Sequence, residues 1–405
     1  MTEAVPAADT TFPVPRGCPF AEPSQYEELR KQAPVTRVPL HSGLRAWWIS
    51  RHADVRAVLG DQLFSSDRRH ENYPLIDSEV TRQRARTEQP AMINLDGEAH
   101  AAARRAVIGE FTVKRLAALR PRVQHLVDGL IDRILATEER QVDLVEMLSL
   151  PVPSMVICEL IGVPYADHEF FQERSARMIR RATDSVERQR CVSDLREYLD
   201  RLLARKETEP GDDLLSRQIE RQREAGGIRR EELVSLAFLL LIAGHETTAN
   251  MISLGVIGLL RHPDQLAVVK ADPSRAPMAV EELLRYFSIV EMVTSRVATK
   301  DVEVGGVTIK AGDGVVTSGL SANWDPEVFA NPDKLDIERG ARHHLAFGFG
   351  PHQCLGQNLA RQELQIVFDT VFRRIPGLRL ATPVEDIPLK TDTNVYGVYR
   401  LPVTW

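Results

Sequence analysis

A glycine-rich loop that ends in a cysteine, over residues 347–356, constrains this chain more than any other segment. Its sequence, FGFGPHQCLG, has three glycines in ten residues, which permit positive φ and close approach to a bulky group. An apolar stripe at helical spacing follows, to about residue 374. Cys354 therefore precedes a helix N-terminus, whose dipole and backbone N–H groups lower the pKa of a thiol. Such a cysteine is a metal ligand or a nucleophile; a buried, inert cysteine in a turn is the alternative.

The rest of the chain reads as mainly α with minor β. Strands are expected near 36–40 and 46–50, and 302–304 should form a hairpin with 307–309 about Gly305-Gly306. No linker rich in Pro, Ser or Gly divides the chain, so we expect an extended leader over residues 1–20 and one domain over residues 21–405. Apolar residues at helical spacing predict helices over 52–59, 98–110, 113–136, 141–161, 166–182, 186–206, 212–225, 231–260 and 275–287.

Composition and charge argue against several protein classes. The 405 residues are 43% hydrophobic and 27% charged, as in soluble globular proteins. A net charge of −6 without a basic tail argues against non-specific nucleic-acid binding. The four cysteines form no CxxC pair, which fits a reducing cytosol. The first twenty residues lack signal-peptide features, and the most apolar stretch, 233–243, is too short to span a bilayer. We therefore expect a cytoplasmic protein that binds neither nucleic acid nor membrane.

The loop matches F-G-x-G-x-H-x-C-x-G at every fixed position, and this pattern resembles the ligand loop of the cytochrome P-450 superfamily, the haem-thiolate monooxygenases. The resemblance extends over residues 20–405 and is closest to soluble bacterial members that oxidise secondary metabolites and xenobiotics. It implies a single-domain, triangular helical prism with small β-sheets, in which haem b lies between the long central helix and the cysteine-loop helix. It also implies that Cys354 is the axial thiolate ligand of the iron, with Phe347 and Gly348 in the haem-binding loop.

A Glu–Arg pair in the helix at 275–287 supports the resemblance. Glu282 and Arg285 are one turn apart and, taken alone, would be an exposed ion pair worth well under ~1 kcal/mol. In the superfamily this E-x-x-R pair is buried and meets an arginine from the coil before the cysteine loop. Arg339 stands where that third member is expected, so the resemblance implies a structural triad that fixes the haem-binding core.

The segment AGHETT at 243–248 is unusual because a glycine and two threonines are unfavourable inside a helix. By resemblance, its small residues widen the helix beside bound O₂, and Glu246 and Thr247 deliver the protons that oxygen activation consumes. Solvent-facing Glu and Thr side chains are the alternative. His245 is interpreted as a hydrogen-bonding partner within the helix rather than as a metal ligand.

A third set of residues matches the haem propionate contacts of the family. His100 and Arg104 are one turn apart on a predicted helix, so both can point at one carboxylate. Arg296, ahead of the hairpin, and His352, two residues before the cysteine, match the remaining contacts.

The expected activity is insertion of one atom of O₂ into a C–H bond of a hydrophobic small molecule, such as a secondary metabolite, macrolide, steroid-like or xenobiotic compound. No flavin or nicotinamide region precedes or follows the chain, so the electrons are expected from a separate ferredoxin and its reductase. Arg105, Lys114 and Arg342 are candidates for the docking face, with ordinary solvated charges as the alternative. The resemblance implies that the pocket is lined by parts of 68–95 and 170–190 and by Leu240, Ala243, Ile289, Val290, Val293 and Val395. Many relatives have a proline in the wall corresponding to 286–295, and its absence here leaves the path of that wall open.

Three other functions compete with this interpretation. A haem-thiolate peroxygenase would use hydrogen peroxide, but its relatives replace the acid–alcohol pair that Glu246 and Thr247 retain. A haem sensor would need an output domain or a DNA-binding motif. A Zn²⁺ site made of His343, His344, His352 and Cys354 lacks the short paired spacings of closed zinc sites and leaves the glycines unexplained.

Overall fold

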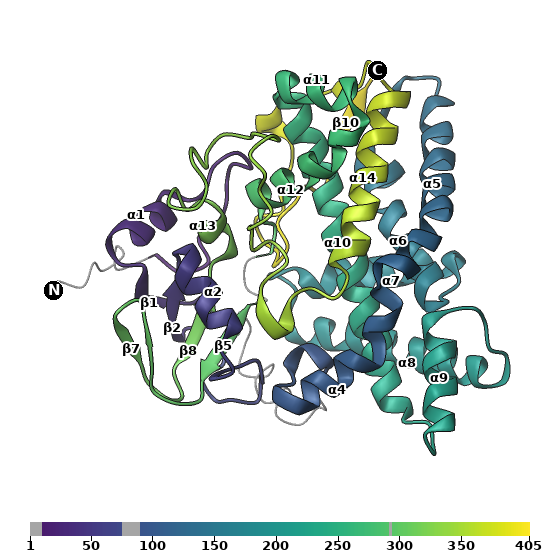
Figure 1. The fold of residues 1–405 in the computed structure, drawn as a ribbon. Helices are drawn as coiled ribbons and strands as arrows, with labels where there is room; N and C mark the ends of the chain where they lie inside the picture. The colour runs from purple at the N-terminus through teal and green to yellow at the C-terminus, as the bar shows by residue number, and fades with distance from the viewer. Residues whose placement is uncertain (1–9, 75–89, 291–293) are drawn as a thin grey trace. The chain divides into compact units, whose positions relative to one another are not determined.

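The computed structural model describes residues 10–74, 90–290 and 294–405, and it is mainly helical with small sheets, as the sequence predicts (Figure 1). The chain forms two compact units. The first unit comprises Met1–Ala101, Arg261–Leu355 and Leu389–Gly397, and the second comprises Ala102–Leu260, Gly356–Pro388 and Val398–Trp405. The expectation of a single domain over 21–405 stays a prediction.

The first unit is built around a five-stranded sheet. Its strands in spatial order are β1 (Val35–Pro39), β2 (Arg45–Ile49), β8 (Gly314–Thr317), β5 (Ser295–Ala298) and β3 (Phe64–Ser65). Two of its three interior strands, β8 and β5, are buried along their whole length, whereas the interior strand β2 is partly exposed. The predicted hairpin is confirmed, since β6 (Val302–Val304) pairs with β7 (Val307–Ile309). Phe12, within the expected leader, is fully buried and lies against Tyr26 and Trp48.

The first unit also contains helices, several of which contribute residues near the cysteine loop. They are α1 (Ser24–Gln32), α2 (His52–Gly60), α11 (Pro263–Ala271), α12 (Ala276–Phe287) and α13 (Gly319–Asn323). A further helix, α4 (Gly97–Ile108), begins in this unit and continues into the second.

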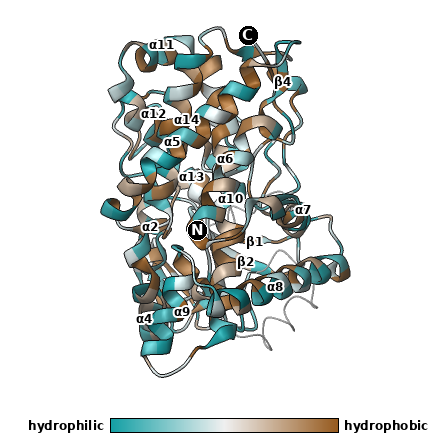
Figure 2. Cartoon of the chain, turned by 90° about the vertical axis from the view of Figure 1, so that its right-hand side faces the viewer, coloured by the Kyte–Doolittle hydropathy of each residue, from teal (hydrophilic) through white to brown (hydrophobic). Residues whose placement is uncertain are grey.

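The second unit is a bundle of long helices with a small sheet. Asp184 and Asp213 accept hydrogen bonds from backbone N–H groups at the starts of α8 and α9, so local capping sets where these helices begin. Figure 2 shows both hydrophobic and hydrophilic residues around α8, as expected for an amphipathic helix. The unit contains α5 (Val113–Leu135), α6 (Pro151–Ile161), α7 (His168–Ile179), α8 (Ser185–Thr208), α9 (Leu214–Glu224), α10 (Arg230–Arg261, whose last residue belongs to the first unit) and α14 (Gln357–Arg374).

The long helix α10 has 32 residues and packs closely against α14. A Cβ atom at Gly255 would lie 2.3 Å from the ring of Phe368, so glycine allows the two helices to approach. By length and composition α10 could cross a membrane, but buried residues recur from Leu233 to Leu259, as in the core helix of a globular protein. This finding is weak evidence for a membrane span.

The helix predicted over 141–161 is wrong in its first part. Gln141–Asp143 forms strand β4, which pairs with β10 (Pro402–Thr404), and a π-helical turn at Val145–Ser149 separates it from α6. Helical periodicity in the sequence does not reveal a strand whose partner lies some 260 residues away. Pro151 begins α6 because a proline in the first turn has no N–H to leave unsatisfied.

Candidate active site

The cysteine loop is closed by its own backbone. The N–H of Cys354 donates to the carbonyl oxygen of Phe347 at 2.9 Å, and the N–H of Gln353 donates to that of Gly350 at 3.0 Å. Gly348 and Gly350 have φ values of 69° and 72°, in the left-handed region that favours glycine. Cys354 is exposed at the end of this loop, three residues before α14 begins.

The loop lies against α2 in a way that no larger residue at position 350 would permit. A Cβ atom at Gly350 would be 2.5 Å from the carbonyl oxygen of Leu59. Next to it, the Phe349 ring stacks under the guanidinium of Arg56, with 4.2 Å between the guanidinium carbon and the ring centroid. The loop is therefore held by residues almost 300 positions earlier in the chain.

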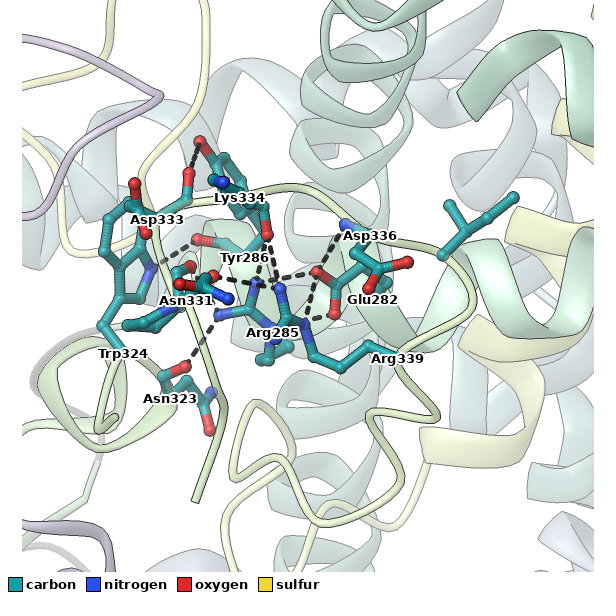
Figure 3. A network of polar contacts seen from close by, with 12 residues as sticks. Glu282, Arg285, Tyr286, Asn323, Trp324, Asn331, Asp333, Lys334, Asp336 and Arg339 are labelled. Carbon is teal, nitrogen blue, oxygen red and sulfur yellow. Dashed lines mark hydrogen bonds and ion pairs between the residues drawn. The ribbon is translucent and has the colours of Figure 1, made fainter. Parts of the chain in front are cut away.

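The buried residues Glu282 and Arg285 form a cluster with the partly exposed Arg339 (Figure 3). Two Arg285 nitrogens donate to the two carboxylate oxygens of Glu282 at 2.7 and 2.8 Å, and Arg339 Nε donates to Glu282 Oε1 at 3.2 Å. The Glu282 and Arg285 side chains are 1% and 0% exposed, so this is not the exposed pair considered above.

Backbone carbonyl groups complete the hydrogen bonding of this cluster. Arg285 also donates to the carbonyl oxygens of Asn323, Pro332 and Lys334, at 2.9, 3.0 and 3.2 Å. Every partner lies in the coil or short helix ahead of the cysteine loop. Buried charges tolerate desolvation only when they are paired and hydrogen-bonded in this way, so the cluster ties α12 to that coil.

His100 and His352 lie side by side in the first unit. Their ring centroids are 3.9 Å apart, with the rings inclined by 27°. His352 Nε2 is also 3.2 Å from Ser66 Oγ, and Asp96 accepts hydrogen bonds from Ser65 Oγ and from the N–H of Ser66. The structure thus brings together two of the predicted propionate contacts on a polar framework.

Arg296 is a buried cation, with 5% of its surface exposed. It donates to the carbonyl oxygen of Ser295 at 2.7 Å and forms no ion pair within the described part of the chain. Burial lowers the pKa of its guanidinium, since the charged form loses hydration. A buried guanidinium without a carboxylate partner suits an anionic group of a bound cofactor. Arg104 lies one turn after His100 on α4 and is half-buried.

The predicted proton-delivery residues lie in the middle of α10. Glu246 is buried, with 6% of its surface exposed. Thr247 Oγ1 donates to the carbonyl oxygen of Ala243 at 2.8 Å, whereas Ala243 itself is exposed. A Cβ atom at Gly244 would lie 2.9 Å from Ile157 of α6, so glycine permits close packing on the other side.

His245 forms hydrogen bonds within the second unit, as the sequence interpretation holds. Nδ1 lies 2.6 Å from the carbonyl oxygen of Leu241, one turn earlier, and Nε2 lies 2.8 Å from Ser175 Oγ of α7. Since the carbonyl oxygen can only accept, Nδ1 carries the proton, and Nε2 accepts from the serine when the ring is neutral.

The residues proposed for the substrate pocket are distributed over both units. Ile289 and Val395 are buried in the first unit, where Val290 forms an isolated antiparallel bridge with Val395. Ser288, with φ 40°, ends α12 ahead of this bridge, so the wall turns here without a proline. Leu240 is buried on α10, and Val293 lies outside the described residues.

Asn323 supports the backbone that leads to the cysteine loop, although no motif in the sequence points to it. Its Oδ1 accepts from the N–H of Leu345 at 2.7 Å, and its Nδ2 donates to Ser288 Oγ at 2.7 Å. These partners lie 22 and 35 positions away, so no local pattern marks the residue.

The zinc interpretation is wrong for the described residues. No three His, Cys, Asp or Glu side chains in that part of the chain gather as metal ligands would. His344 faces Glu281 and His352 faces His100 instead.

Comparison with known proteins identifies the family. The model of the family described as Cytochrome P-450 matches residues 25–272 and 276–402. Pentalenic acid synthase of Streptomyces avermitilis is 50% identical over 399 residues, which are 98% of each chain. The crystal structure of cytochrome P-450 MoxA from Nonomuraea recticatena has a TM-score of 0.91 and 65% identity, covering 98% of each chain. The methyl hydroxylase MycCI from Micromonospora griseorubida, solved with mycinamicin VIII bound, has a TM-score of 0.90 and 40% identity, covering 98% of this chain and 100% of MycCI. The chain belongs to the cytochrome P-450 family.

Proposed function

We propose that this cytochrome P-450 monooxygenase hydroxylates a hydrophobic secondary metabolite. The family fixes the reaction class and the cofactor, a haem with an axial cysteine thiolate. When bound, the haem supplies the oxidising chemistry, because electron donation from the thiolate favours cleavage of the O–O bond. Two relatives are named for pentalenic acid and mycinamicin VIII, which supports a secondary metabolite as the substrate class.

Cys354 is the proposed iron ligand, and the other cysteines support this choice. Burial raises the pKa of the Cys158 thiol to about 12 and also raises that of Cys191, so both stay protonated at neutral pH. Cys18 is exposed but lies outside any glycine-rich loop. Cys354 is exposed on a loop whose backbone is already closed, as a ligand that must reach a large cofactor requires.

The propionate groups of the haem are proposed to bind His100, Arg104, Arg296 and His352. The observation that supports this assignment most is the buried guanidinium of Arg296, which forms no ion pair among the described residues. An isolated buried cation is unfavourable, and an anionic cofactor group would compensate it.

Glu246 and Thr247 are proposed to move the protons that the reaction consumes. In the structure the Thr247 hydroxyl donates its proton in a hydrogen bond to the Ala243 carbonyl oxygen, which leaves the hydroxyl oxygen able to accept a hydrogen bond. Rotation of the hydroxyl would pass its own proton on, and the buried carboxyl of Glu246 would supply the replacement.

A separate ferredoxin with its reductase is the proposed electron source, and the cytoplasm is the proposed location of the enzyme. On the second unit, Val113 and Ile108 are 72% and 46% exposed, and Arg105 and Lys114 are exposed beside them in sequence. Apolar residues among cations are typical of a surface that binds an acidic protein. Arg342, on the first unit, is exposed ahead of the cysteine loop.

The first test is the carbon monoxide difference spectrum of the reduced, purified protein. A strongly red-shifted Soret band is expected in the wild type and absent in Cys354→His. Hydroxylation then needs O₂ and reduced ferredoxin, and turnover supported by hydrogen peroxide alone would instead indicate a peroxygenase. A folded protein without a haem band would contradict the proposal.

A further inference from the structure

His344 lies ahead of the cysteine loop and is almost completely buried, with 1% of its side chain exposed. Its Nδ1 accepts a hydrogen bond from the N–H of Ala346 at 3.2 Å. Its Nε2 lies 3.1 Å from Glu281 Oε2, and the Glu281 side chain is 16% exposed. The imidazole therefore connects α12 with the backbone immediately before Phe347.

The two partners determine the protonation of this ring. A backbone N–H can only donate, so Nδ1 must be the nitrogen with the lone pair. The single proton of the neutral imidazole then sits on Nε2 and is donated to the Glu281 carboxylate. Each polar atom of the ring has one suited partner, which fixes both the tautomer and the orientation of the ring.

The His344 ring contacts the backbone just before the cysteine loop through the N–H of Ala346. The next residue, Phe347, provides the carbonyl oxygen that accepts the N–H of Cys354. The preceding residue, Leu345, is held by Asn323 Oδ1, and the carbonyl oxygen of His343 lies 2.9 Å from His52 Nε2. The Phe347 ring also lies 5.9 Å from the His344 ring, centroid to centroid.

Adjacent residues of α12 thus contact two different parts of the chain. Glu282 binds Arg339 in the coil, and Glu281 binds His344 nearer the cysteine. The first contact holds the coil as a whole, whereas the second reaches within one residue of the carbonyl that receives the Cys354 N–H.

We propose that His344, oriented by Glu281, is a positioning residue that holds the Ala346–Phe347 backbone so that Cys354 remains the thiolate ligand of the haem. This inference rests on the proposed role of Cys354. It gives His344 a role distinct from metal binding. It predicts that the Nδ1 contact with Ala346 matters directly and that the Glu281 contact matters through the orientation of the ring.

The test uses the full-length, haem-loaded protein and measures how long the red-shifted carbon monoxide band survives before it converts to the band of a haem without thiolate. His344→Leu removes both contacts. The amide of His344→Gln lies near the position of Nε2 and can reach Glu281 but leaves no acceptor at the position of Nδ1, whereas His344→Asn keeps an acceptor near the position of Nδ1. Loss of one buried hydrogen bond should shorten the lifetime of the red-shifted band about tenfold. We therefore expect His344→Leu and His344→Gln to convert about tenfold faster than the wild type, and the lifetime of His344→Asn to lie within about threefold of the wild type.

Two further variants complete the design. Glu281→Gln retains an acceptor without the charge and should shorten the lifetime about threefold. His343→Asn is the matched control, since only its backbone carbonyl is used and its side chain is exposed, so its lifetime should equal that of the wild type.

The outcomes separate the two proposals. A wild type without the red-shifted band contradicts the role of Cys354 itself. A wild-type band with an unchanged lifetime in His344→Leu overturns the positioning role. Equal lifetimes in His344→Gln and His344→Asn do so as well, because a merely structural effect would not depend on which nitrogen is replaced. If His344→Leu fails to fold, the lifetimes of His344→Gln and His344→Asn still test the positioning role.

Discussion

The cysteine loop and the α10 segment at 243–248 both contain residues that disfavour regular structure, yet they are held in different ways. The loop and its approach depend on partners far away in sequence, including Leu59, Asn323 and Glu282. In the α10 segment His245 contacts Ser175 of α7, but the hydroxyl of Thr247 bonds only to its own preceding turn, at the carbonyl oxygen of Ala243, among the described residues. Long-range buried contacts define a position, whereas a hydroxyl bonded to its own helix can rotate and change partners. The first arrangement suits a fixed ligand, and the second suits proton transfer.

The largest expected effect comes from removing the buried carboxylate of Glu282, which binds the coil ahead of the cysteine loop. Glu282→Ala leaves Arg285 buried without its counter-ion and should lower the free energy of unfolding by about 3–5 kcal/mol. Chemical denaturation and haem content after purification measure this. Lys31→Ala, in the exposed pair with Glu27, is the control and should change stability by no more than about 0.5 kcal/mol. Similar losses in both variants would mean that burial does not distinguish the two pairs.

Arg296→Met should change two properties in opposite directions. Without haem, the protein loses an uncompensated buried cation, so its free energy of unfolding should rise by about 1 kcal/mol. With haem, it loses a charge-assisted contact, so haem affinity should fall about 10- to 100-fold. Haem transfer to a competing apoprotein measures affinity, and denaturation of the apoprotein measures stability. A destabilised apoprotein would show that the charge of Arg296 is compensated within the protein and does not require a bound anion.

Thr247→Ala should leave the fold intact and uncouple the reaction. The lost side-chain bond is local, so stability should change by less than about 1 kcal/mol, while product per reducing equivalent should fall at least about tenfold. Oxygen, peroxide and product are measured together with the native substrate. Thr247→Ser should retain coupling, and Thr248→Ala, at the buried neighbour, is the control. Full coupling in Thr247→Ala would remove the contrast between a fixed loop and a proton-transferring helix.

The smallest expected effect concerns Glu363 on α14, which is 2% exposed and whose Oε2 has no hydrogen-bond partner among the described residues. Burial raises its pKa well above the usual range, so the folded state keeps a proton that the unfolded state releases. Stability is therefore lost as pH rises from the unfolded towards the folded pKa. Glu363→Gln cannot ionise and should gain about 1 kcal/mol over the wild type at higher pH, and less in acid. Melting temperatures across pH measure this, and a pH-independent difference would contradict it.

The sequence was sufficient to predict a structural element wherever the pattern that specifies the element is local. The hairpin at 302–309, the long helix near 231–260 and the cysteine loop all follow from residues within a few positions of one another. Strand β4, by contrast, needs β10, and Asn323 needs Leu345 and Ser288. The histidine stack of His100 on His352 joins positions some 250 residues apart. Such contacts depend on the folded backbone, which periodicity does not describe.

The burial of Glu282 is likewise not predicted by any local sequence pattern. Its spacing to Arg285 is that of an ordinary surface ion pair, and only the resemblance distinguished it from one. The carbonyl oxygens that accept from Arg285 belong to the last residue of the short helix α13 and to the coil after it, so no secondary-structure pattern in the sequence predicts these contacts.

The contacts of individual glycines have a consequence for enzyme engineering. A Cβ atom at Gly350 would overlap the backbone of Leu59, and one at Gly255 would overlap the ring of Phe368, so substitutions at either position should destabilise the protein. Ala243 is exposed on α10, but by resemblance its small side chain leaves room for bound O₂, so a larger residue there would compete with the oxygen-binding site rather than with the protein core. A library that alters the regioselectivity of this enzyme should therefore keep Ala243 and both glycines unchanged.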